Sequence, residues 1–147
     1  MAMTLEISIA DRAAILAHAA GSDHEICGLL LGQGSRVDLV EPCANVAADP
    51  ARRFEIDPAR LLAAHRGARR GGPRVIGHYH SHPSGDPRPS PRDAADAAAD
   101  GSFWVLVAGD VMTAWRATAS GALYGRFDPV PLAEPGCAAS PERPLDG

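Results

Sequence analysis

The chain has 147 residues, enough for one domain with its own hydrophobic core. Hydrophobic residues make up 46% and charged residues 22% of it, and the formal net charge of −4 argues against a general nucleic-acid binder. Three widely spaced cysteines, with no Cys-x-x-Cys pair, exclude a disulfide framework and a thiolate zinc site. The N-terminus lacks the features of a signal peptide, and no apolar run is long enough to span a membrane. We therefore expect a cytoplasmic protein with reduced thiols.

The first part of the chain predicts a strand, a helix and a strand pair. Residues 5–9 alternate apolar and polar side chains, as a half-buried strand does. Asp11 is a candidate N-cap for a helix that runs to about residue 20, where Gly21 ends it. Residues 26–31 form a nearly unbroken apolar run, typical of a buried central strand, and residues 37–41 are predicted to pair with it.

The middle of the chain predicts a second helix with a clear start signal. Residues 54–56 are a short predicted strand, and Asp57 with Pro58 combines a capping carboxylate with proline at the first helical position. The helix is expected to end near Gly71. Its predicted buried side consists of Leu61, Leu62, Ala64 and His65.

The rest of the chain predicts more strands and one further helix. Residues 74–82 form a histidine-bearing strand, and residues 90–100 an alanine-rich helix. Three strands follow, at residues 103–108, 111–117 and 123–127, the first two as a hairpin. This order predicts a single α/β domain with a mixed central sheet flanked by helices.

The domain is expected to cover residues 1–128. Residues 129–147 contain five prolines and little hydrophobic mass, so we expect a mostly disordered C-terminal tail.

Three histidines at alternate positions of the predicted strand suggest a metal site. His80 and His82 share one strand face, about 6.5 Å apart at Cα, so both imidazoles can reach one ion. His78 and His82 would be about 13 Å apart, too far for one tetrahedral ion. His78 is therefore expected to be a pocket wall or a hydrogen-bond partner of a ligand. Asp93 follows the proline-rich loop and is a candidate third ligand, since two imidazoles and a carboxylate suit zinc.

Each remaining candidate has an alternative interpretation. Asp93 could be the carboxylate of a capping box opened by Ser90, a role that need not exclude metal binding. Ser90 could be a plain N-cap or could donate its hydroxyl to a tetrahedral oxyanion. Glu25, at the mouth of the buried strand, could be a solvated turn residue, or the general base that hydrolysis at a metal requires.

Taken together, these motifs resemble the JAMM (MPN-plus) metalloprotease family. The resemblance rests on Glu-Ile-Cys-Gly-Leu-Leu-Leu-Gly at residues 25–32, on His80-Ser81-His82-Pro83 and on Ser90-x-x-Asp93, and extends over about residues 5–127. Asn45 followed by Phe-Glu-Ile-Asp-Pro at residues 54–58 is similar to the short prokaryotic members. Two features differ from the family pattern: position 78 is histidine rather than apolar or aromatic, and there is no room for the insertions that select polyubiquitin linkages.

The resemblance implies a cytidine-deaminase-like fold and one zinc ion per chain. It implies zinc ligation by His80, His82 and Asp93, with Glu25 as general base and Ser90 at the oxyanion. The implied activity is that of a zinc (iso)peptidase that hydrolyses the bond after the C-terminal Gly-Gly of a ubiquitin-like or sulfur-carrier β-grasp protein. No nucleic-acid or membrane partner is expected.

Two other functions remain open at this stage. Residues 82–93 also resemble RadC-type proteins linked to DNA repair, although residues 25–32 and 54–58 favour the peptidase branch. A metal-free MPN scaffold that only binds partners is the other alternative, although such scaffolds typically lack the ligand set that this chain keeps.

Overall fold

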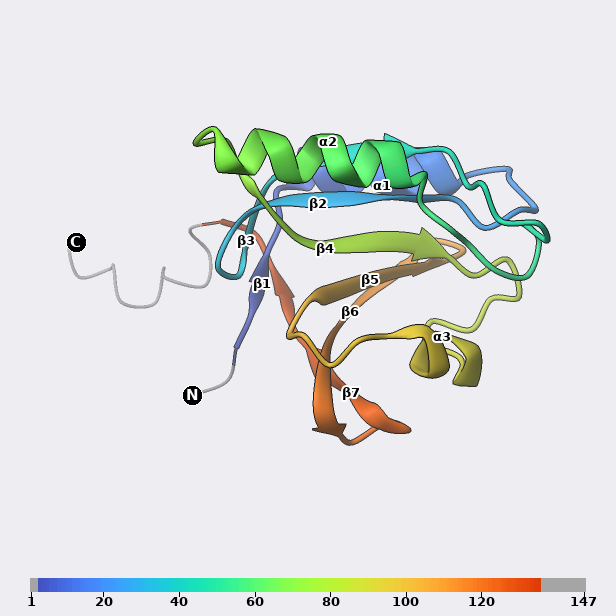
Figure 1. Cartoon of the computed structure of the whole chain (residues 1–147). Helices are drawn as coiled ribbons and strands as arrows, with labels where there is room; N and C mark the ends of the chain where they lie inside the picture. Colours follow the sequence, from blue (N-terminus) through green and yellow to red (C-terminus); the bar gives the residue numbers. More distant parts are fainter. Residues whose placement is uncertain (1–2, 136–147) are drawn as a thin grey trace.

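Within residues 3–135, eight strands form one mixed sheet in the order β7-β6-β5-β4-β2-β3-β1-β8 (Figure 1). The computed structural model describes residues 3–135. The strands are β1 (Leu5–Glu6), β2 (Cys27–Gln33), β3 (Arg36–Cys43), β4 (Arg74–Ser81), β5 (Phe103–Ala108), β6 (Val111–Gly121), β7 (Gly125–Val130) and β8 (Leu132–Ala133). The helices are α1 (Ile9–Ala19), α2 (Pro58–Arg69) and α3 (Pro91–Asp96).

The sheet mixes parallel and antiparallel pairs, which confirms the predicted fold class. Strand β2 runs antiparallel to both β3 and β4, and β4 runs parallel to β5. Strands β5, β6 and β7 form an antiparallel meander. Helix α2 precedes β4 in the chain and contacts it, and the short helix α3 lies near the C-terminal end of that strand (Figure 1).

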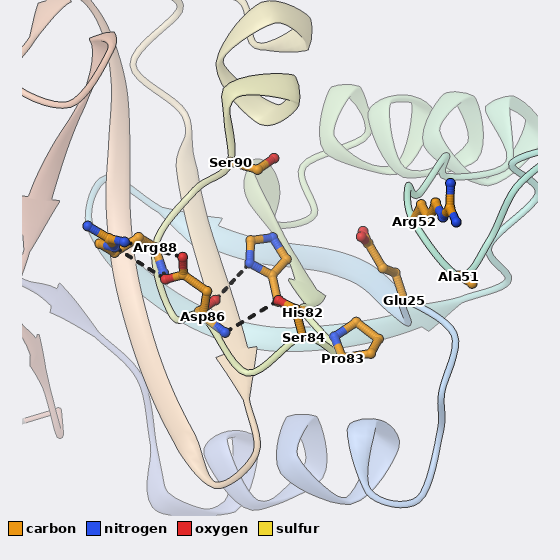
Figure 2. A pocket seen from close by; sticks show the side chains of 9 residues that line it. All are labelled: Glu25, Ala51, Arg52, His82, Pro83, Ser84, Asp86, Arg88 and Ser90. Carbon is orange, nitrogen blue, oxygen red and sulfur yellow. Dashed lines mark hydrogen bonds and ion pairs between the residues drawn. The ribbon is translucent and has the colours of Figure 1, made fainter.

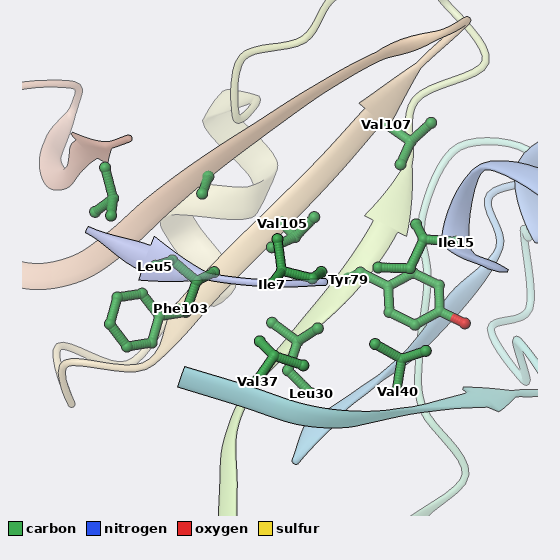
Figure 3. Close-up of a cluster of buried hydrophobic side chains, with 12 residues drawn as sticks. Leu5, Ile7, Ile15, Leu30, Val37, Val40, Tyr79, Phe103, Val105 and Val107 are labelled. Atoms are coloured by element: carbon green, nitrogen blue, oxygen red, sulfur yellow. The ribbon is translucent and has the colours of Figure 1, made fainter. Parts of the chain in front are cut away.

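The two faces of the central strands carry different chemistry. On one face, Leu30 of β2 and Tyr79 of β4 pack with Ile15 of α1 in the main hydrophobic core, drawn in Figure 3. On the other face, Leu29 of β2 lies opposite His78 of β4. Because side chains alternate along a strand, the buried apolar core and the histidines occupy opposite faces of β4.

The N-terminal strand is shorter than predicted. Ser8, rather than Asp11, is the N-cap of α1, and its Oγ accepts a hydrogen bond from the Asp11 backbone N–H at 3.0 Å. Ile7 is fully buried whereas Ile9 is 64% exposed. The chain therefore leaves the sheet after Ile7. Asp11 lies in the first helical turn, where its negative charge interacts favourably with the helix dipole.

The start of α2 is confirmed, but its predicted buried side is wrong. Asp57 caps the helix and Pro58 occupies its first turn. Leu61 and Leu62 are 36% and 48% exposed, and His65 is also exposed.

The segment before α2 explains this difference. Phe54 and Ile56 pack against Leu29 and Leu31 of β2, so little of that surface is left for α2. Ala64 is the α2 residue that joins this cluster. Residues 54–56 form no strand, because their one sheet-like contact is an isolated bridge between Ile56 and Asn45.

The end of the described chain also departs from the prediction. Helix α3 stops at Asp96 instead of residue 100. The sheet continues beyond residue 128 through the end of β7 and through β8, which pairs with β1. The first residues of the predicted disordered tail, 129–133, therefore lie in the sheet region. The last twelve residues of that tail, 136–147, lie outside the described part. No helix within residues 3–135 is long and apolar enough to cross a membrane.

Candidate metal and catalytic site

The histidine pair lies where β4 ends. His80 is fully buried, and it is paired across the sheet with Cys27 of β2 and Leu106 of β5. His82 follows the strand and is 7% exposed, and its backbone N–H donates to Val107 O at 2.8 Å. This last bond continues the parallel pairing with β5 past the end of β4. It keeps His82 on the same face as His80.

The donor atoms of three side chains converge at this point. His82 Nε2 lies 3.1 Å from His80 Nε2 and 3.1 Å from Asp93 Oδ2, and His80 Nε2 lies 3.5 Å from Asp93 Oδ1. Zn–N bonds of 2.0–2.1 Å in a tetrahedron imply about 3.3 Å between neighbouring ligand atoms. The three side chains therefore fit the edges of a tetrahedral site whose fourth position is free.

The second nitrogen of His82 determines which nitrogen can bind a metal. His82 Nδ1 lies 2.9 Å from the backbone carbonyl of Asp86. A carbonyl only accepts hydrogen bonds, so Nδ1 carries the proton and Nε2 presents its lone pair to the cluster. Lone pairs and a carboxylate at this distance repel each other unless positive charge lies among them. The donor set therefore fits a bound cation.

His78 contacts the back of His80. Its Nε2 lies 3.3 Å from His80 Nδ1, and the two rings are stacked at 5.3 Å. If His80 Nδ1 donates to His78, then His80 Nε2 is free for the metal. His78 thus lies outside the three-residue cluster, in the position of a partner that orients a ligand.

Asp93 forms the capping box considered from the sequence, and its carboxylate also lies beside the two histidines. Its backbone N–H donates to Ser90 Oγ at 3.0 Å, and its Oδ2 accepts from the Ser90 N–H at 2.9 Å. This capping box begins α3 and orients the carboxylate toward the histidines. Ser90 Oγ uses a lone pair in this contact, so its O–H remains able to donate to another group.

Glu25 is held at the mouth of β2 by backbone contacts. Its N–H donates to Pro50 O at 2.8 Å, and its carbonyl accepts from Asn45 Nδ2 at 2.8 Å. The next residue, Ile26, donates its N–H to Ser81 Oγ at 2.9 Å, which joins this segment to the end of β4. Glu25 is 8% exposed, so it is not the solvated turn residue of the alternative interpretation.

Burial and neighbouring charges shift the pKa values of Glu25 and Asp93 in opposite directions. Burial raises the pKa of Glu25 to about 7, against the opposing effect of the charge on His82. Burial also disfavours the charge of Asp93, but hydrogen bonds from His80 and His82 keep the pKa of Asp93 well below its ordinary value. The Glu25 carboxyl can thus gain or lose a proton near neutral pH, whereas the Asp93 carboxyl stays ionised.

The pKa values of His80 and His82 also shift in opposite directions. Burial lowers the pKa of His80 below its ordinary value. Burial acts in the same direction on His82, but its hydrogen bonds to Asp93 and to the Asp86 carbonyl raise the pKa of His82. The contact with Asp93 thus favours the charged form of His82, whereas burial favours the neutral form of His80.

A pocket of about 270 Å³ opens on the site. Glu25, His82 and Ser90 line it, together with Ala51, Arg52, Pro83, Ser84, Asp86 and Arg88. Figure 2 shows Glu25 and Arg52 on one side of the His82 ring, Arg88 on the opposite side and Ser90 above the ring. His80 and Asp93 lie deeper and are buried.

Two supporting residues were missed by the sequence analysis. Phe54 stacks on the His80 ring with centroids 4.1 Å apart. The Asn45 Oδ1 accepts from the N–H groups of Ala47 and Glu55 while its Nδ2 donates to Glu25 O. Both residues were noted only as parts of a resemblance, without these contacts. An isolated asparagine and an isolated phenylalanine carry no spacing signal, so sequence reasoning had nothing with which to find these contacts.

Comparisons with known proteins agree with this geometry. Residues 9–118 match the family described as prokaryotic homologs of the JAB domain. A desampylase of Haloferax volcanii is 34% identical over 113 residues, 72% of this chain and 81% of that protein. A probable TtuB-protein conjugate cleaving protease of Thermus thermophilus is 41% identical over 71 residues, 48% of each chain. The solution structure of a Desulfitobacterium hafniense protein has a TM-score of 0.74 at 25% identity, covering 89% of this chain and 92% of that one.

Proposed function

Because the chain belongs to the prokaryotic JAB-domain branch of the JAMM/MPN family, we propose that it hydrolyses the bond after the C-terminal Gly-Gly of a β-grasp carrier protein, with one zinc ion per chain. The predicted family is thereby confirmed, and so is the class of activity: the protein is a JAMM-type hydrolase of conjugates of ubiquitin-like or sulfur-carrier proteins. The RadC-like alternative and the non-catalytic scaffold are not favoured.

The observation that carries the proposal is the convergence of five side chains at one pocket. His80, His82 and Asp93 are the proposed zinc ligands, because their donor atoms lie within 4.8 Å of one another. Glu25 and Ser90 both line the pocket that opens on these ligands. A zinc ion held there supplies a Lewis acid and acidifies water.

The chain's own residues perform the proton transfers of the proposed reaction. Glu25 removes a proton from the attacking water, whose oxygen bonds to the carbonyl carbon of the last glycine. The Ser90 O–H donates to the oxyanion that forms on that carbonyl. The C–N bond then breaks, and Glu25 returns the proton to the leaving amine. The products are a carrier with a free C-terminal carboxylate and an amine.

The preference for Gly-Gly follows from the need to bring backbone close to the buried ligands. Glycine has no Cβ, so its carbonyl can approach the site without steric conflict. Valine at the last position of the carrier would introduce a branched side chain at the carbon next to the reacting carbonyl.

The test uses the Gly-Gly carrier of the same organism, extended by one amino acid, and the zinc-loaded protein. Mass spectrometry should show loss of the extension, and a chelator should prevent it. Replacing the terminal glycine of the carrier with valine should block cleavage. The proposal is wrong if every Gly-Gly-extended carrier of the organism stays intact, or if the valine form is cleaved equally well.

We also propose that the protein acts in the cytoplasm. Cys27 and Cys43 face each other on the antiparallel strands β2 and β3, and both are free thiols. Neighbouring buried cysteines that remain unbonded are typical of a reducing compartment.

A further inference from the structure

Arg52 lies on the same side of the pocket as the proposed base. It comes from the loop between β3 and α2, and Figure 2 shows it on the same side of the His82 ring as Glu25, with Ser90 above the ring. Hydrogen bonds fix this loop on either side of Arg52. Pro50 O accepts from the Glu25 N–H at 2.8 Å, and Arg53 O accepts from Asn45 Nδ2 at 3.0 Å. Since Asn45 also holds the Glu25 carbonyl, the same asparagine fixes the backbone of the base and the backbone next to Arg52.

The guanidinium of Arg52 is free to bind a ligand. Within residues 3–135 it has neither an ion pair nor a side-chain hydrogen bond, although it lines the pocket. Arg88, the second arginine of the pocket, is bound to Asp86 through two contacts of 3.2 and 3.4 Å. Its charge is therefore balanced, whereas that of Arg52 is not. The unbalanced positive charge of the pocket lies on the Glu25 side.

The Glu25 side is where the leaving group of the proposed reaction lies. Glu25 returns its proton to the leaving amine, so that nitrogen must come within hydrogen-bond reach of the carboxylate. A group attached to that nitrogen extends away from Ser90, because Ser90 receives the carbonyl oxygen. Arg52 thus faces the part of the substrate that departs.

We infer that Arg52 binds the α-carboxylate of the leaving group, and that the preferred substrate is a Gly-Gly carrier extended by a single free amino acid. This inference rests on the proposed function and specifies its substrate. In such an extension the carboxylate is attached to the carbon next to the leaving nitrogen, close enough for one guanidinium to bind it while Glu25 protonates the amine. Arginine suits this role because its planar fork matches a carboxylate with two parallel hydrogen bonds.

A lysine isopeptide lacks this anion. Its leaving nitrogen lies at the end of a four-carbon side chain, and the α-carboxyl group of that lysine is part of a peptide bond. Arg52 would then face a neutral alkyl chain and remain unpaired. The structure therefore favours release of an amino acid over release of a modified protein.

The experiment compares three substrates that share one carrier. The first carries a C-terminal alanine with a free carboxylate after Gly-Gly, and the second carries the same alanine as its carboxamide. The third joins Gly-Gly to the side chain of Nα-acetyl-lysine amide. The zinc-loaded wild-type protein should cleave the free acid with kcat/KM about 10- to 100-fold above the other two, the range expected for hydrogen bonds to a charged group.

Substitutions in the loop distinguish the effect of Arg52 from that of its neighbour Arg53. Arg52→Ala should lower kcat/KM for the free acid by about the same 10- to 100-fold and leave the carboxamide unchanged. Arg52→Lys should recover part of the loss, because it keeps the charge without the fork. Arg53→Ala is the matched control, since this arginine is exposed and does not line the pocket, and it should behave as wild type. Turnover of the carboxamide reports correct folding of each variant.

Equal cleavage of the acid and the carboxamide by the wild-type protein would overturn the inference and leave the proposed function intact. So would an equal loss of both activities in Arg52→Ala, because Arg52 would then contact the carrier rather than the leaving group. Absence of cleavage of all three substrates would refute the proposed function together with the inference.

Discussion

The orientation of the proposed ligands depends on backbone and side-chain groups that do not touch the metal position themselves. The Asp86 carbonyl fixes the tautomer of His82, His78 contacts the rear nitrogen of His80, and the capping box aims the Asp93 carboxylate. Removal of a ligand and removal of its support should therefore have different consequences for the metal.

Metal content should distinguish the ligands from their neighbours. Asp93→Ala removes one of three ligands, so the purified protein should retain little zinc. Ser90→Ala removes the other half of the same capping box and should keep its zinc, which controls for loss of the cap. His78→Ala should bind zinc no more than about 10- to 100-fold more weakly, as expected for a supporting residue. Elemental analysis measures the zinc content, and a competitive chelator titration measures the zinc affinity. Full zinc occupancy in Asp93→Ala would show that Asp93 acts only as a helix cap.

Glu25 is expected to act in turnover without binding the metal. Glu25→Gln keeps the shape of the side chain and removes the base, so kcat should fall by roughly 10²- to 10⁴-fold with the zinc content unchanged. Glu55→Gln, on the exposed part of the neighbouring loop, is the control. Near-normal turnover by Glu25→Gln would exclude this carboxylate from the mechanism.

The raised pKa of Glu25 should be visible in the stability of the metal-free protein. Its carboxyl has a pKa of about 7 in the folded state and an ordinary value of 4.5. Between these values the unfolded chain releases the proton first, so the folded state binds more protons and stability falls as pH rises. The free energy of unfolding of wild type minus that of Glu25→Gln should decrease from pH 4.5 to 7 and level off above it. Urea titrations in chelator at several pH values measure this difference, and a constant difference would contradict the raised pKa.

At the scale of elements, the close pairing of β2 with β4 brings Glu25 and the histidines together. Gly28 of β2 lies opposite Tyr79 of β4, and a Cβ at position 28 would overlap the Tyr79 ring. That ring is fully buried, and its hydroxyl is hydrogen-bonded to His18 Nδ1 at 2.8 Å. The glycine is thus required by the core on the face opposite the histidines.

Two glycine substitutions should have opposite effects on stability. Gly28→Ala should destabilise the protein by about 1–3 kcal/mol, because the buried Tyr79 ring has to move. Gly67→Ala, inside α2 and with no atom within 4 Å of the new Cβ, should stabilise it by about 0.5–1 kcal/mol through helix propensity. Denaturant unfolding compares both with the wild type. A harmless Gly28→Ala would show that β2 and β4 are less closely packed than described here.

At the scale of the whole molecule, the two ends of the described chain meet in the sheet. The N–H of Leu5 donates to Pro131 O and that of Ile7 to Ala133 O, both at 2.9 Å. Val130 is 8% exposed and belongs to the main core. The segment after residue 128 is therefore part of the folded domain as far as β8.

Truncation should reveal this contribution. A chain that ends at residue 128 loses Val130 from the core and both hydrogen bonds to β1, so it should be less stable than a chain that ends at residue 135 by about 2–5 kcal/mol. Thermal and urea unfolding of the two chains measure the difference. Equal stabilities would mean that β8 contributes nothing to the fold.

The local pattern of the sequence predicted the central strands and the residues of the candidate site. Apolar runs and alternation predicted β2, β4 and β5 close to their observed limits, since these strands are buried and their periodicity is undisturbed. The spacing of His80 and His82 and the Ser90-x-x-Asp93 motif were readable because each is a short-range geometric relation, on one strand and in one helical turn.

Only the tertiary structure decided the relations between distant segments. The leucines of α2 that were predicted to be buried face solvent, because Phe54 and Ile56 already cover β2. The tertiary structure drew residues 132 and 133 into the sheet beside β1. It also brought Arg52 to the side of Glu25 through Asn45. Such contacts join residues far apart in the chain, and they depend on which surfaces remain uncovered once the strands have paired, a quantity that no local pattern of residues contains.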